Sequence, residues 1–415
     1  MKILHINTSD RIGGAAIAAF RLHNAMLCFG IDSKYLVLNR TITDRADVKK
    51  KSGYIVRIKR VINSVLEKII TKNMHGIKGV FSSFKYGISV SKVHEIIEAD
   101  IIYLHWINSS FINYRGLKKI LKTGKPVFWF MHDMFAITGG CHHSFDCINY
   151  QTACCKCPYH KGALLGNLAD WQYKAKKKIY KQFKNLMFIA PSKWLFECAK
   201  KSGLTDSKQI WHIPNIIDSN IFKPIDKKIV RQLLSLNTNK KIIGFGADSA
   251  LTNPYKGWDY LKEALQVLAK DKTQQDKKIE VLIVGNNYSK EIAESIPFTV
   301  HFLGRLHDEI SLVAAYNCMD VFVIPSLAEN FPNTILESLN CDTPVVGFNI
   351  GGIPDTINEN TGYLAEYKNS RDLAEGISLI LKKGKANVSE YVKSFAPEIV
   401  LDKHKEMWNT QGISQ

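Results

Sequence analysis

Two carboxylates, Glu329 and Glu337, stand eight positions apart in the run Ser-Leu-Ala-Glu-Asn-Phe-Pro-Asn-Thr-Ile-Leu-Glu. Glu329 follows an apolar strand and Glu337 stands one helical turn into the next segment. Both side chains can therefore face one pocket at the carboxyl end of a parallel sheet, where open α/β folds bind ligands. Two such acceptors suit a polyhydroxyl ligand. A solvated helix face is the usual alternative, but isoleucine and leucine surround Glu337 in the sequence.

Two further loops have the residues to hold an anion beside such a ligand. Gly13 and Gly14 follow the first strand and precede a small-residue helix, so backbone amides and the helix dipole favour an anion there. A plain tight turn is the alternative. Lys256, in Asn-Pro-Tyr-Lys-Gly-Trp, follows a strand and can neutralise a diphosphate as a point charge. Taken alone, it could be any surface lysine.

His132 and Asp133 end the strand-like run Val-Phe-Trp-Phe-Met-His-Asp. A histidine at the carboxyl end of a central strand can touch a substrate, and the aspartate after it could fix its tautomer. A buried structural histidine is the alternative. His105, which follows Ile-Tyr-Leu, is placed similarly but with less support.

Five of the nine cysteines fall between Cys141 and Cys157. The spacing Cys141-x5-Cys147-x6-Cys154-x2-Cys157 provides four thiolates within one loop, enough for a tetrahedral zinc site. A closed shell of four cysteines would be structural, because no position is left for water. Reduced or disulfide-paired cysteines are the alternative. Three residues are spare ligand candidates: His142, His143 and Cys155.

Short apolar runs alternate with helix-like segments in both halves, which predicts two doubly wound α/β domains with parallel sheets. The expected strands of the first half are Lys2 to Ile6, Ser33 to Leu38, Ile101 to Leu104, Pro126 to Met131 and Leu186 to Ala190. Those of the second half are Lys241 to Phe245, Glu280 to Val284, Val300 to Leu303, Val321 to Ile324 and Pro344 to Gly347. The boundary is expected between Ile213 and Pro224, where two prolines and an Asn/Asp-rich stretch bracket a change in charge.

The net charge of +18 is unevenly distributed. Residues 1–215 hold 34 Lys and Arg against 13 Asp and Glu, whereas residues 216–415 hold 22 against 25. This asymmetry indicates an anionic partner for the first half only. Nucleic acid, an anionic membrane and an anionic lipid-linked substrate all fit.

Residues 54–73 predict a basic amphipathic helix, which could lie in a membrane interface or pack against the first sheet. One stripe is apolar: Ile55, Ile58, Ile62, Val65 and Ile69. The basic residues lie elsewhere: Arg57, Lys59, Arg60 and Lys68. The amino terminus lacks an extended apolar signal region, and no apolar run approaches the roughly 18 residues that span a bilayer. We therefore expect a cytoplasmic protein, peripheral on the inner face of the cell membrane.

Taken together, these motifs resemble the retaining GT-B glycosyltransferases often called family 4. The resemblance also rests on four segments in family order: Ala190 to Trp194, Ile213 to Asp218, Met319 to Ser326 and Thr343 to Pro354. The pattern HDM…TGGC…CxxCP is similar to a subgroup from bacterial surface-polysaccharide clusters. The resemblance implies two Rossmann-like domains facing a central cleft. Residues 1–215 would form the acceptor-side domain with a cysteine-rich loop at 139–158, residues 216–388 the nucleotide-sugar domain, and residues 389–415 a helix crossing back.

The resemblance also implies roles for individual residues. Glu337 would hold the ribose hydroxyls, Glu329 the transferred sugar, and Lys256 the diphosphate. Gly14 would approach the diphosphate and His132 would contact the donor sugar. Further donor-binding residues would be Gly13, Ser192, Arg305, Asn330, Phe331, Pro332 and Asn333, and the acceptor side would include His105 and Asp133. The arginine that the family places five positions before the lysine is Leu251 here, which leaves that charge to Arg305 or Arg11.

The implied function is retaining transfer of a sugar from a nucleotide-diphosphate-sugar to a glycan acceptor, lipid-linked, in surface polysaccharide biosynthesis. No metal would be needed for the chemistry, so positioning and leaving-group electrostatics would stabilise the transition state. A nucleotide-sugar epimerase or phosphorylase on the same architecture is the closest alternative. A zinc-stabilised nucleic-acid-binding protein could use the basic half, but the sequence lacks a recognised RNA or DNA module.

Overall fold

The computed structural model describes residues 1–71, 81–90, 93–159, 168–246, 253–270, 279–285, 290–384 and 388–413. The chain forms two compact units. Unit 1 comprises Met1–Ile216 and Pro397–Gln415, and unit 2 comprises Ile217–Ala396. The division thus falls inside the segment from Ile213 to Pro224, and the chain returns to unit 1 for its last helix.

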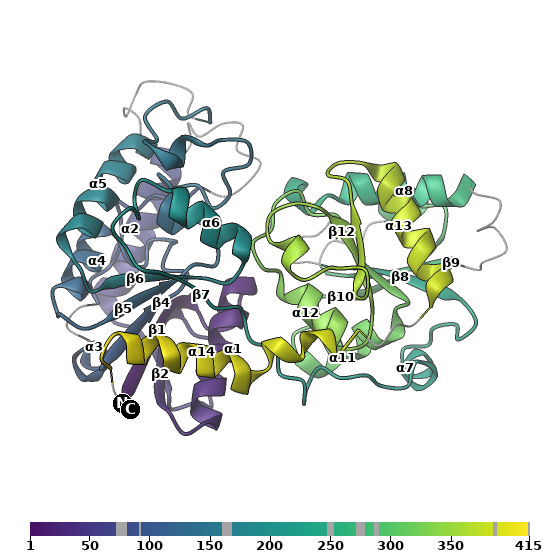
Figure 1. Ribbon diagram of the computed structural model, residues 1–415, viewed down its shortest axis with the longest axis horizontal. Coiled ribbons are helices and arrows are strands. Elements are labelled where there is room, and N and C mark those ends of the chain that lie inside the picture. Colours follow the sequence, from purple (N-terminus) through teal and green to yellow (C-terminus); the bar gives the residue numbers. More distant parts are fainter. Residues whose placement is uncertain are drawn as a thin grey trace. The chain divides into compact units, whose positions relative to one another are not determined.

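Unit 1 is built on a parallel sheet whose strand order is β3-β2-β1-β4-β5-β6-β7 (Figure 1). Its strands are β1 (Lys2–Ser9), β2 (Asp32–Asn39), β3 (Val48–Lys50), β4 (Ile101–Leu104), β5 (Val127–Phe130), β6 (Leu186–Ala190) and β7 (Ile210–His212). The chain winds outward in one direction from β1 to β3 and in the other from β4 to β7. The topological switch point therefore lies between β1 and β4, the position at which such sheets bind ligands.

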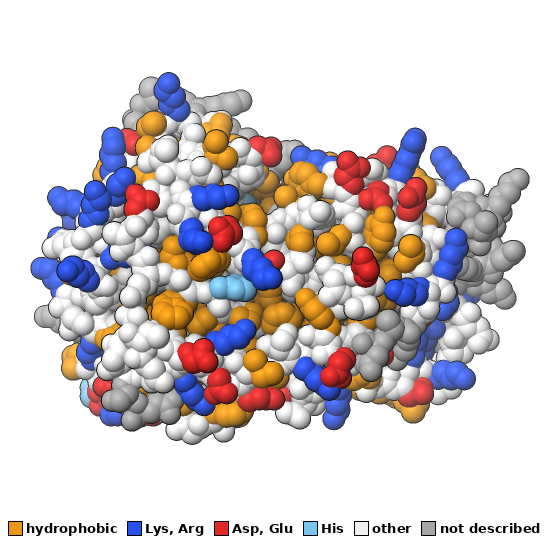
Figure 2. All heavy atoms as spheres, in the orientation of Figure 1, with side chains coloured by type: hydrophobic (Ala, Val, Ile, Leu, Met, Phe, Trp, Pro, Cys, Tyr) orange, Lys and Arg blue, Asp and Glu red, His pale blue; other side chains and the backbone are white. Residues whose placement is uncertain are grey.

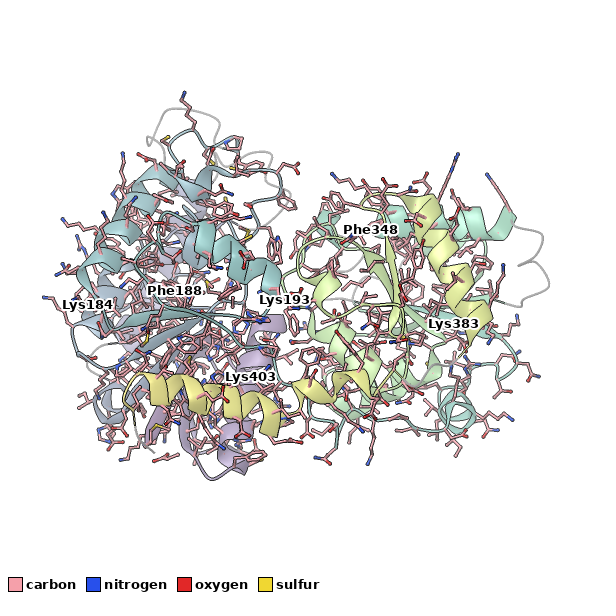
Figure 3. The ribbon with its side chains drawn as sticks, viewed as in Figure 1. Lys184, Phe188, Lys193, Phe348, Lys383 and Lys403 are labelled. Carbon is pink, nitrogen blue, oxygen red and sulfur yellow. The ribbon has the colours of Figure 1, made fainter. Side chains whose placement is uncertain are left out.

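Helices cover both faces of this sheet. On one face, α1 (Gly14–Cys28) and α14 (Pro397–Thr410) pack through Met26 and Trp408 against Tyr103 and Phe130. On the other face pack α4 (Tyr114–Leu121), α5 (Leu168–Gln182) and α6 (Lys193–Lys201), with the short α3 (His94–Glu98) beside them. Phe188 of β6 lies inside the layers, whereas Lys184 just before it extends outward (Figure 3). Successive side chains of a strand point to opposite faces of the sheet. Because helices cover both faces, the side chains on both are apolar.

The amphipathic helix α2 (Tyr54–Thr71) forms, but it does not pack through its apolar stripe. The four members of the stripe with described side chains are between 43% and 57% exposed: Ile58, Ile62, Val65 and Ile69. The opposite face docks, because Val56 packs on the core and Glu67 accepts hydrogen bonds from Ser83 N–H and Ser110 Oγ. The packed alternative is therefore wrong for the stripe itself. None of the described helices is long and apolar enough to cross a membrane.

Unit 2 has a parallel sheet of order β10-β9-β8-β11-β12-β13. Its strands are β8 (Lys241–Gly246), β9 (Ile279–Val284), β10 (Thr299–Gly304), β11 (Val321–Ile324), β12 (Val345–Phe348) and β13 (Gly362–Ala365). Here the winding direction changes between β8 and β11. The expectation of two doubly wound domains is thus confirmed, and the ten predicted strands all form.

The helices of unit 2 again lie on both faces. On one face, α8 (Trp258–Lys270) and α13 (Ser370–Lys383) bury Leu265 and Ile377 against the sheet. On the other face, α7 (Lys227–Leu233), α11 (Glu309–Cys318) and α12 (Asn333–Asn340) bury Val313, Ile335 and Leu339. The short α10 (Lys290–Glu294) completes the described α-helices of the unit. β8 and β11 are central strands of this sheet.

Candidate active site

Two loops meet at the switch point of unit 2. Lys256 ends a short 3-10 turn after β8, and Glu329 lies in the loop that follows β11. Lys256 Nζ lies 2.6 Å from Glu329 Oε1, and the two side chains are only 19% and 14% exposed. The backbone joins the same loops, since Leu327 N–H donates to the Tyr255 carbonyl at 2.7 Å. The structure therefore brings together two residues that are 73 positions apart in the sequence.

Glycines hold the Glu329 loop in place. A Cβ on Gly351 would lie 2.0 Å from the Glu329 carbonyl oxygen, and Gly351 has a φ of +59°. Gly352 N–H donates to that same carbonyl at 3.1 Å. On the other side, Gly257 (φ +74°) passes so close to Pro325 that a Cβ would lie 1.8 Å from its carbonyl oxygen. Only glycine permits these approaches, so the backbone beneath the Lys256–Glu329 pair is tightly defined.

Glu337 lies on α12 and is only 3% exposed. Its Oε2 accepts a hydrogen bond from Tyr316 Oη at 2.9 Å. A buried carboxylate is costly unless it is hydrogen-bonded, so Tyr316 stabilises the charge and fixes the side chain. Tyr316 was not among the predicted site residues, and its place in an ordinary apolar-looking helix gave no signal. The four residues that lead from the loop into α12 are all buried: Asn330, Phe331, Pro332 and Asn333.

Three positions bear on the missing arginine. Leu251 lies outside the described residues. Arg305 is exposed directly after β10, a strand that β9 separates from β8. Arg11 in unit 1 stacks over the Phe20 ring, with its guanidinium carbon 5.0 Å from the ring centre. A replacement for the family arginine stays a prediction.

The glycine loop of unit 1 follows β1 at the switch point of that sheet. Gly13 caps α1 with a φ of +91°, and the space around a Cβ on Gly13 or Gly14 is open to at least 4 Å. Asp10 braces the loop, because its buried carboxylate accepts from Thr41 N–H at 2.6 Å and from Ile42 N–H at 2.8 Å. The predicted anion-binding role of this loop is compatible with that open space and stays a prediction.

Three imidazoles form a buried chain through unit 1. His5 Nδ1 lies 2.9 Å from His105 Nε2, and His105 Nδ1 lies 2.9 Å from His132 Nε2. Adjacent rings stack, with 5.2 Å between their centres in both pairs. Both nitrogens of His105 are thus engaged inside the unit, where this residue can position His132. Its assignment to the acceptor side stays a prediction. His5 was missed, although a histidine within an apolar strand is a signal for such a partner.

These buried imidazoles are held neutral. Burial lowers the pKa of His132 to about 4, although Asp133 opposes the shift. Burial likewise places the pKa of His105 well below its ordinary value, and the neighbouring histidines add to the effect. Because His132 Nε2 engages His105, Nδ1 is the nitrogen that a ligand would use. A neutral imidazole can donate or accept one hydrogen bond there, depending on its tautomer.

The expectation that Asp133 fixes the tautomer of His132 is wrong. The Asp133 carboxylate pairs with the ring of His142 and accepts from Phe135 N–H at 2.8 Å, which caps a 3-10 turn. Burial raises the pKa of Asp133, but His142 outweighs that effect and the net pKa is lowered. His105, not Asp133, is the ring partner of His132. His142 was considered a metal ligand from sequence and instead anchors Asp133.

Ser192 has a structural role in the described contacts. It is fully buried, and its Oγ accepts from Leu195 N–H at 3.0 Å to cap α6. Serine at this position typically contributes about 1 kcal/mol to helix stability. Its assignment to donor binding stays a prediction.

The four cysteines predicted to act together do lie together. Cys141, Cys147, Cys154 and Cys157 line one cavity of about 20 Å³ in unit 1. None of the nine cysteines, all of which are described, forms a disulfide. Cys155 is exposed and does not line the cavity. Burial raises the pKa of Cys154 to about 12, so it is a neutral thiol when nothing is bound to it.

The segment that carries the Lys256–Glu329 pair matches a known family. Residues 240–383 match the family described as glycosyl transferases group 1. The matched segment lies within unit 2. The matched segment includes Lys256, Glu329 and Glu337.

Two curated relatives show further similarity. The chain is 21% identical over 380 residues to the putative colanic acid biosynthesis glycosyl transferase WcaC of Escherichia coli (strain K12), covering 87% of this chain and 86% of the relative. It is 34% identical over 160 residues to an N,N'-diacetylbacillosaminyl-diphospho-undecaprenol alpha-1,3-N-acetylgalactosaminyltransferase of Campylobacter jejuni. That match covers 37% of this chain and 39% of the relative.

Solved structures agree on the fold. Sucrose-phosphate synthase from Thermosynechococcus elongatus has a TM-score of 0.67 at 16% identity and covers 100% of both chains. Anabaena HepE in complex with UDP and glucose has a TM-score of 0.61 at 17% identity and covers 99% of both chains. The fold is that of GT-B glycosyltransferases, and the similarities together support a glycosyltransferase enzyme.

Proposed function

We propose that this protein is a retaining family 4 glycosyltransferase that moves a sugar from a nucleotide-diphosphate-sugar to a lipid-linked glycan in bacterial surface polysaccharide biosynthesis. The observation that carries the proposal is the Lys256–Glu329 pair at the switch point of unit 2, inside the matched family segment. A cation and a carboxylate side by side suit a ligand that has both an anionic and a hydroxyl-rich end.

Donor binding would exchange the partners of this pair. The diphosphate competes for the Lys256 ammonium because two phosphates carry more negative charge than one carboxylate. Glu329 is then released to accept hydrogen bonds from the hydroxyls of the transferred sugar. Glu337, already oriented by Tyr316, would accept from the ribose hydroxyls. HepE, a protein of the same fold, binds UDP and glucose, which supports a nucleotide-sugar as the ligand.

Leaving-group stabilisation would then come from Lys256, with Arg305 as a second cation and the Gly13–Gly14 amides as donors. Preorganised charges of this kind act on the charge that develops in the transition state, so the chemistry would proceed without a metal. His132 would contact the donor sugar through Nδ1, since His105 engages its other nitrogen.

Unit 1 would bind the glycan acceptor and contact the membrane surface. Lys and Arg side chains are spread over this unit (Figure 2). The exposed apolar stripe of α2 has basic residues beside it, a combination that binds in the interface of anionic membranes. The Campylobacter jejuni relative is named for an undecaprenol-linked acceptor, which supports a lipid-linked glycan as the acceptor here.

The proposal is tested with the full-length protein and a panel of UDP-, GDP- and ADP-sugars. Native mass spectrometry identifies which donor binds, and a transfer assay with a lipid-linked glycan extract follows the release of free nucleotide. Glycosyl transfer predicts nucleotide release that depends on acceptor. Conversion of the donor into another nucleotide-sugar without acceptor would show an epimerase instead, and salt-sensitive oligonucleotide binding without donor binding would show a nucleic-acid-binding protein.

A further inference from the structure

A small cavity in unit 1 is surrounded by four thiols that come from a single loop. Its volume of about 20 Å³ has room for about one water-sized sphere or one metal ion. Cys141, Cys147, Cys154 and Cys157 line it together with Thr138 and Tyr159. Cys141 lies close enough to each of the other three cysteines to interact with them electrostatically. Four cysteines that line one void are the residue set that zinc takes in tetrahedral structural sites.

The loop is fixed at several points around the cavity. Cys141 forms a single antiparallel bridge with Phe81, and its carbonyl accepts from Thr138 Oγ1 at 2.7 Å. Further along, Cys147 N–H donates to the Ser144 carbonyl at 2.9 Å. The turn before Cys154 is tied to the body of unit 1, because Gly203 N–H donates to the Gln151 carbonyl at 2.9 Å. The cysteines are therefore presented by an ordered loop and not by a flexible one.

A cation and a backbone N–H beside the cavity partly offset the cost of anionic sulfur there. Four thiolates and one Zn²⁺ carry a net charge of about −2, which needs compensation when buried. Lys176 of α5 is fully buried, donates to the Thr138 carbonyl at 3.0 Å and interacts electrostatically with Cys154 and Cys141. The backbone N–H of Gly139 donates to Cys154. Such outer contacts are typical of metal sites, where they orient and stabilise the ligands.

Glycine is required where the loop starts. A Cβ on Gly139 would lie 2.8 Å from Cβ of Cys154 and 2.4 Å from the Ala169 carbonyl oxygen. Gly140 has a φ of +140°, and a Cβ there would collide with Phe81 and Gln172. The Gly139–Gly140 pair thus lets the first cysteine segment approach Cys154 and α5 closely. The TGGC part of the sequence pattern has a physical explanation in this approach.

We propose that Cys141, Cys147, Cys154 and Cys157 bind one structural Zn²⁺ in this cavity. Among the described residues, no three His, Cys, Asp or Glu side chains already form a metal-ligand set, so binding requires the thiols to lose their protons and turn inward. The thiols release four protons as the four Zn–S bonds form. No ligand position is left for water or substrate, so the metal supports the loop and takes no part in sugar transfer.

The site acts on the rest of unit 1 through His142. This residue directly follows Cys141, and its ring pairs with Asp133 and lies 2.8 Å from Ser82 Oγ. Asp133 in turn follows His132 in the chain and caps the next turn. A metal that fixes Cys141 would therefore fix the His142–Asp133 pair beside the histidine chain. The inference does not depend on glycosyl transfer, since it concerns the stability of unit 1.

The test measures metal content of the full-length protein purified under reducing conditions. We expect native and elemental mass spectrometry to give one zinc per chain. Cys147→Ser should lower that stoichiometry to well under half, whereas Cys155→Ser, an exposed cysteine of the same loop, should leave it at one. Zinc-free wild-type protein would overturn the proposal, as would equal loss in both variants.

A second measurement covers the case in which Cys147→Ser does not fold. Wild-type protein is loaded with Co²⁺, and the sulfur-to-cobalt charge-transfer absorption and the d–d bands of a tetrahedral tetrathiolate site are recorded. Cys155→Ser should give the same spectrum. Absence of these bands, or thiol titration of the unfolded wild type showing disulfides among these cysteines, would contradict the zinc site.

Discussion

Lys256 Nζ lies 2.6 Å from Glu329 Oε1, so the cation and carboxylate assigned to opposite ends of the donor neutralise each other in the protein alone. The pair joins the two loops that flank the switch point between β8 and β11. A donor therefore does not enter a site with two unpaired charges. It replaces one ion pair by two sets of contacts, which makes binding sensitive to both residues at once.

Replacing Lys256 should reduce transfer more than stability. Lys256→Met removes the ammonium that would neutralise the leaving diphosphate. The loss of one such preorganised group typically costs about 100- to 1,000-fold in turnover. The free energy of unfolding should fall by about 1–3 kcal/mol, because Glu329 loses this partner at a mostly buried position. Steady-state transfer rates and denaturant unfolding measure the two effects. Lys270→Met, at the exposed end of α8, is the matched control, and equal losses in both variants would contradict the role of Lys256.

Glu337 and Tyr316 should act as a unit in nucleotide binding. Glu337→Gln removes the charge and replaces one of the two acceptor oxygens by an NH2 donor, which should weaken binding of the nucleoside diphosphate at least ten-fold in calorimetry. Tyr316→Phe leaves the carboxylate but removes its 2.9 Å hydrogen bond, which should cost about 1–3 kcal/mol of stability. If Glu337→Gln bound the nucleotide as tightly as wild type, the ribose assignment would be wrong and the buried carboxylate would have only a structural role.

Acid should destabilise unit 1 selectively. Burial lowers the pKa of His132 and His23 to about 4 and that of His404 to about 3. The unfolded chain, with histidine pKa values near 6.5, binds more protons than the folded chain between pH ~6.5 and ~4, so stability falls as the pH drops through this window. Over this window, each such histidine lowers the free energy of unfolding by up to about 3 kcal/mol.

Hydrogen exchange at several pH values measures this effect by region. Peptides from β1, β4 and β5 should lose protection between pH 6.5 and 5 much more than peptides from β8 and β11. His132→Asn should make the dependence shallower, whereas His94→Asn, an exposed histidine, should not change it. Equal acid sensitivity of both units would contradict the buried neutral chain, because the two histidines of unit 2, His301 and His307, are not buried.

The stripe and charges of α2 should bind anionic membranes. Replacing Arg57, Lys59, Arg60 and Lys68 by Gln removes four charges, each worth about 1 kcal/mol at an anionic surface. Binding to phosphatidylglycerol vesicles in flotation should fall at least ten-fold, while phosphatidylcholine vesicles should bind weakly throughout. The control makes the same charge change near α5, at Lys177, Lys178, Lys181 and Lys184. Similar loss in the control would show a diffuse charge effect and contradict a role for α2.

The sequence predicted the central strands well and the edges poorly. Ile101–Leu104, Leu186–Ala190 and Val321–Ile324 have the predicted bounds, because a strand covered on both faces is a continuous apolar run. The strands missed were β3, β7 and β13, and each lies at a sheet edge. The segments VKK and IWH are only three residues long and partly exposed, so no apolar run marks them.

The sequence predicts which site residues meet when they directly follow neighbouring strands. It does not predict contacts that depend on how side chains pack. Lys256 and Glu329 follow strands whose carboxyl ends are neighbours, so their meeting could be expected. The His5–His105–His132 chain could not, because it depends on which side chains face one another within the layer. For the same reason the sequence suggests His132, the neighbour in the chain, as the partner of Asp133, whereas the partner in the structure is His142.

The most direct test of the account is a comparison of donor binding and transfer in Glu329→Gln. With the donor that the sugar-nucleotide panel identifies and a lipid-linked glycan acceptor, this variant should still bind the donor in native mass spectrometry but lose at least 100-fold in acceptor-dependent nucleotide release. Near-normal release by Glu329→Gln would contradict the central role of the Lys256–Glu329 pair.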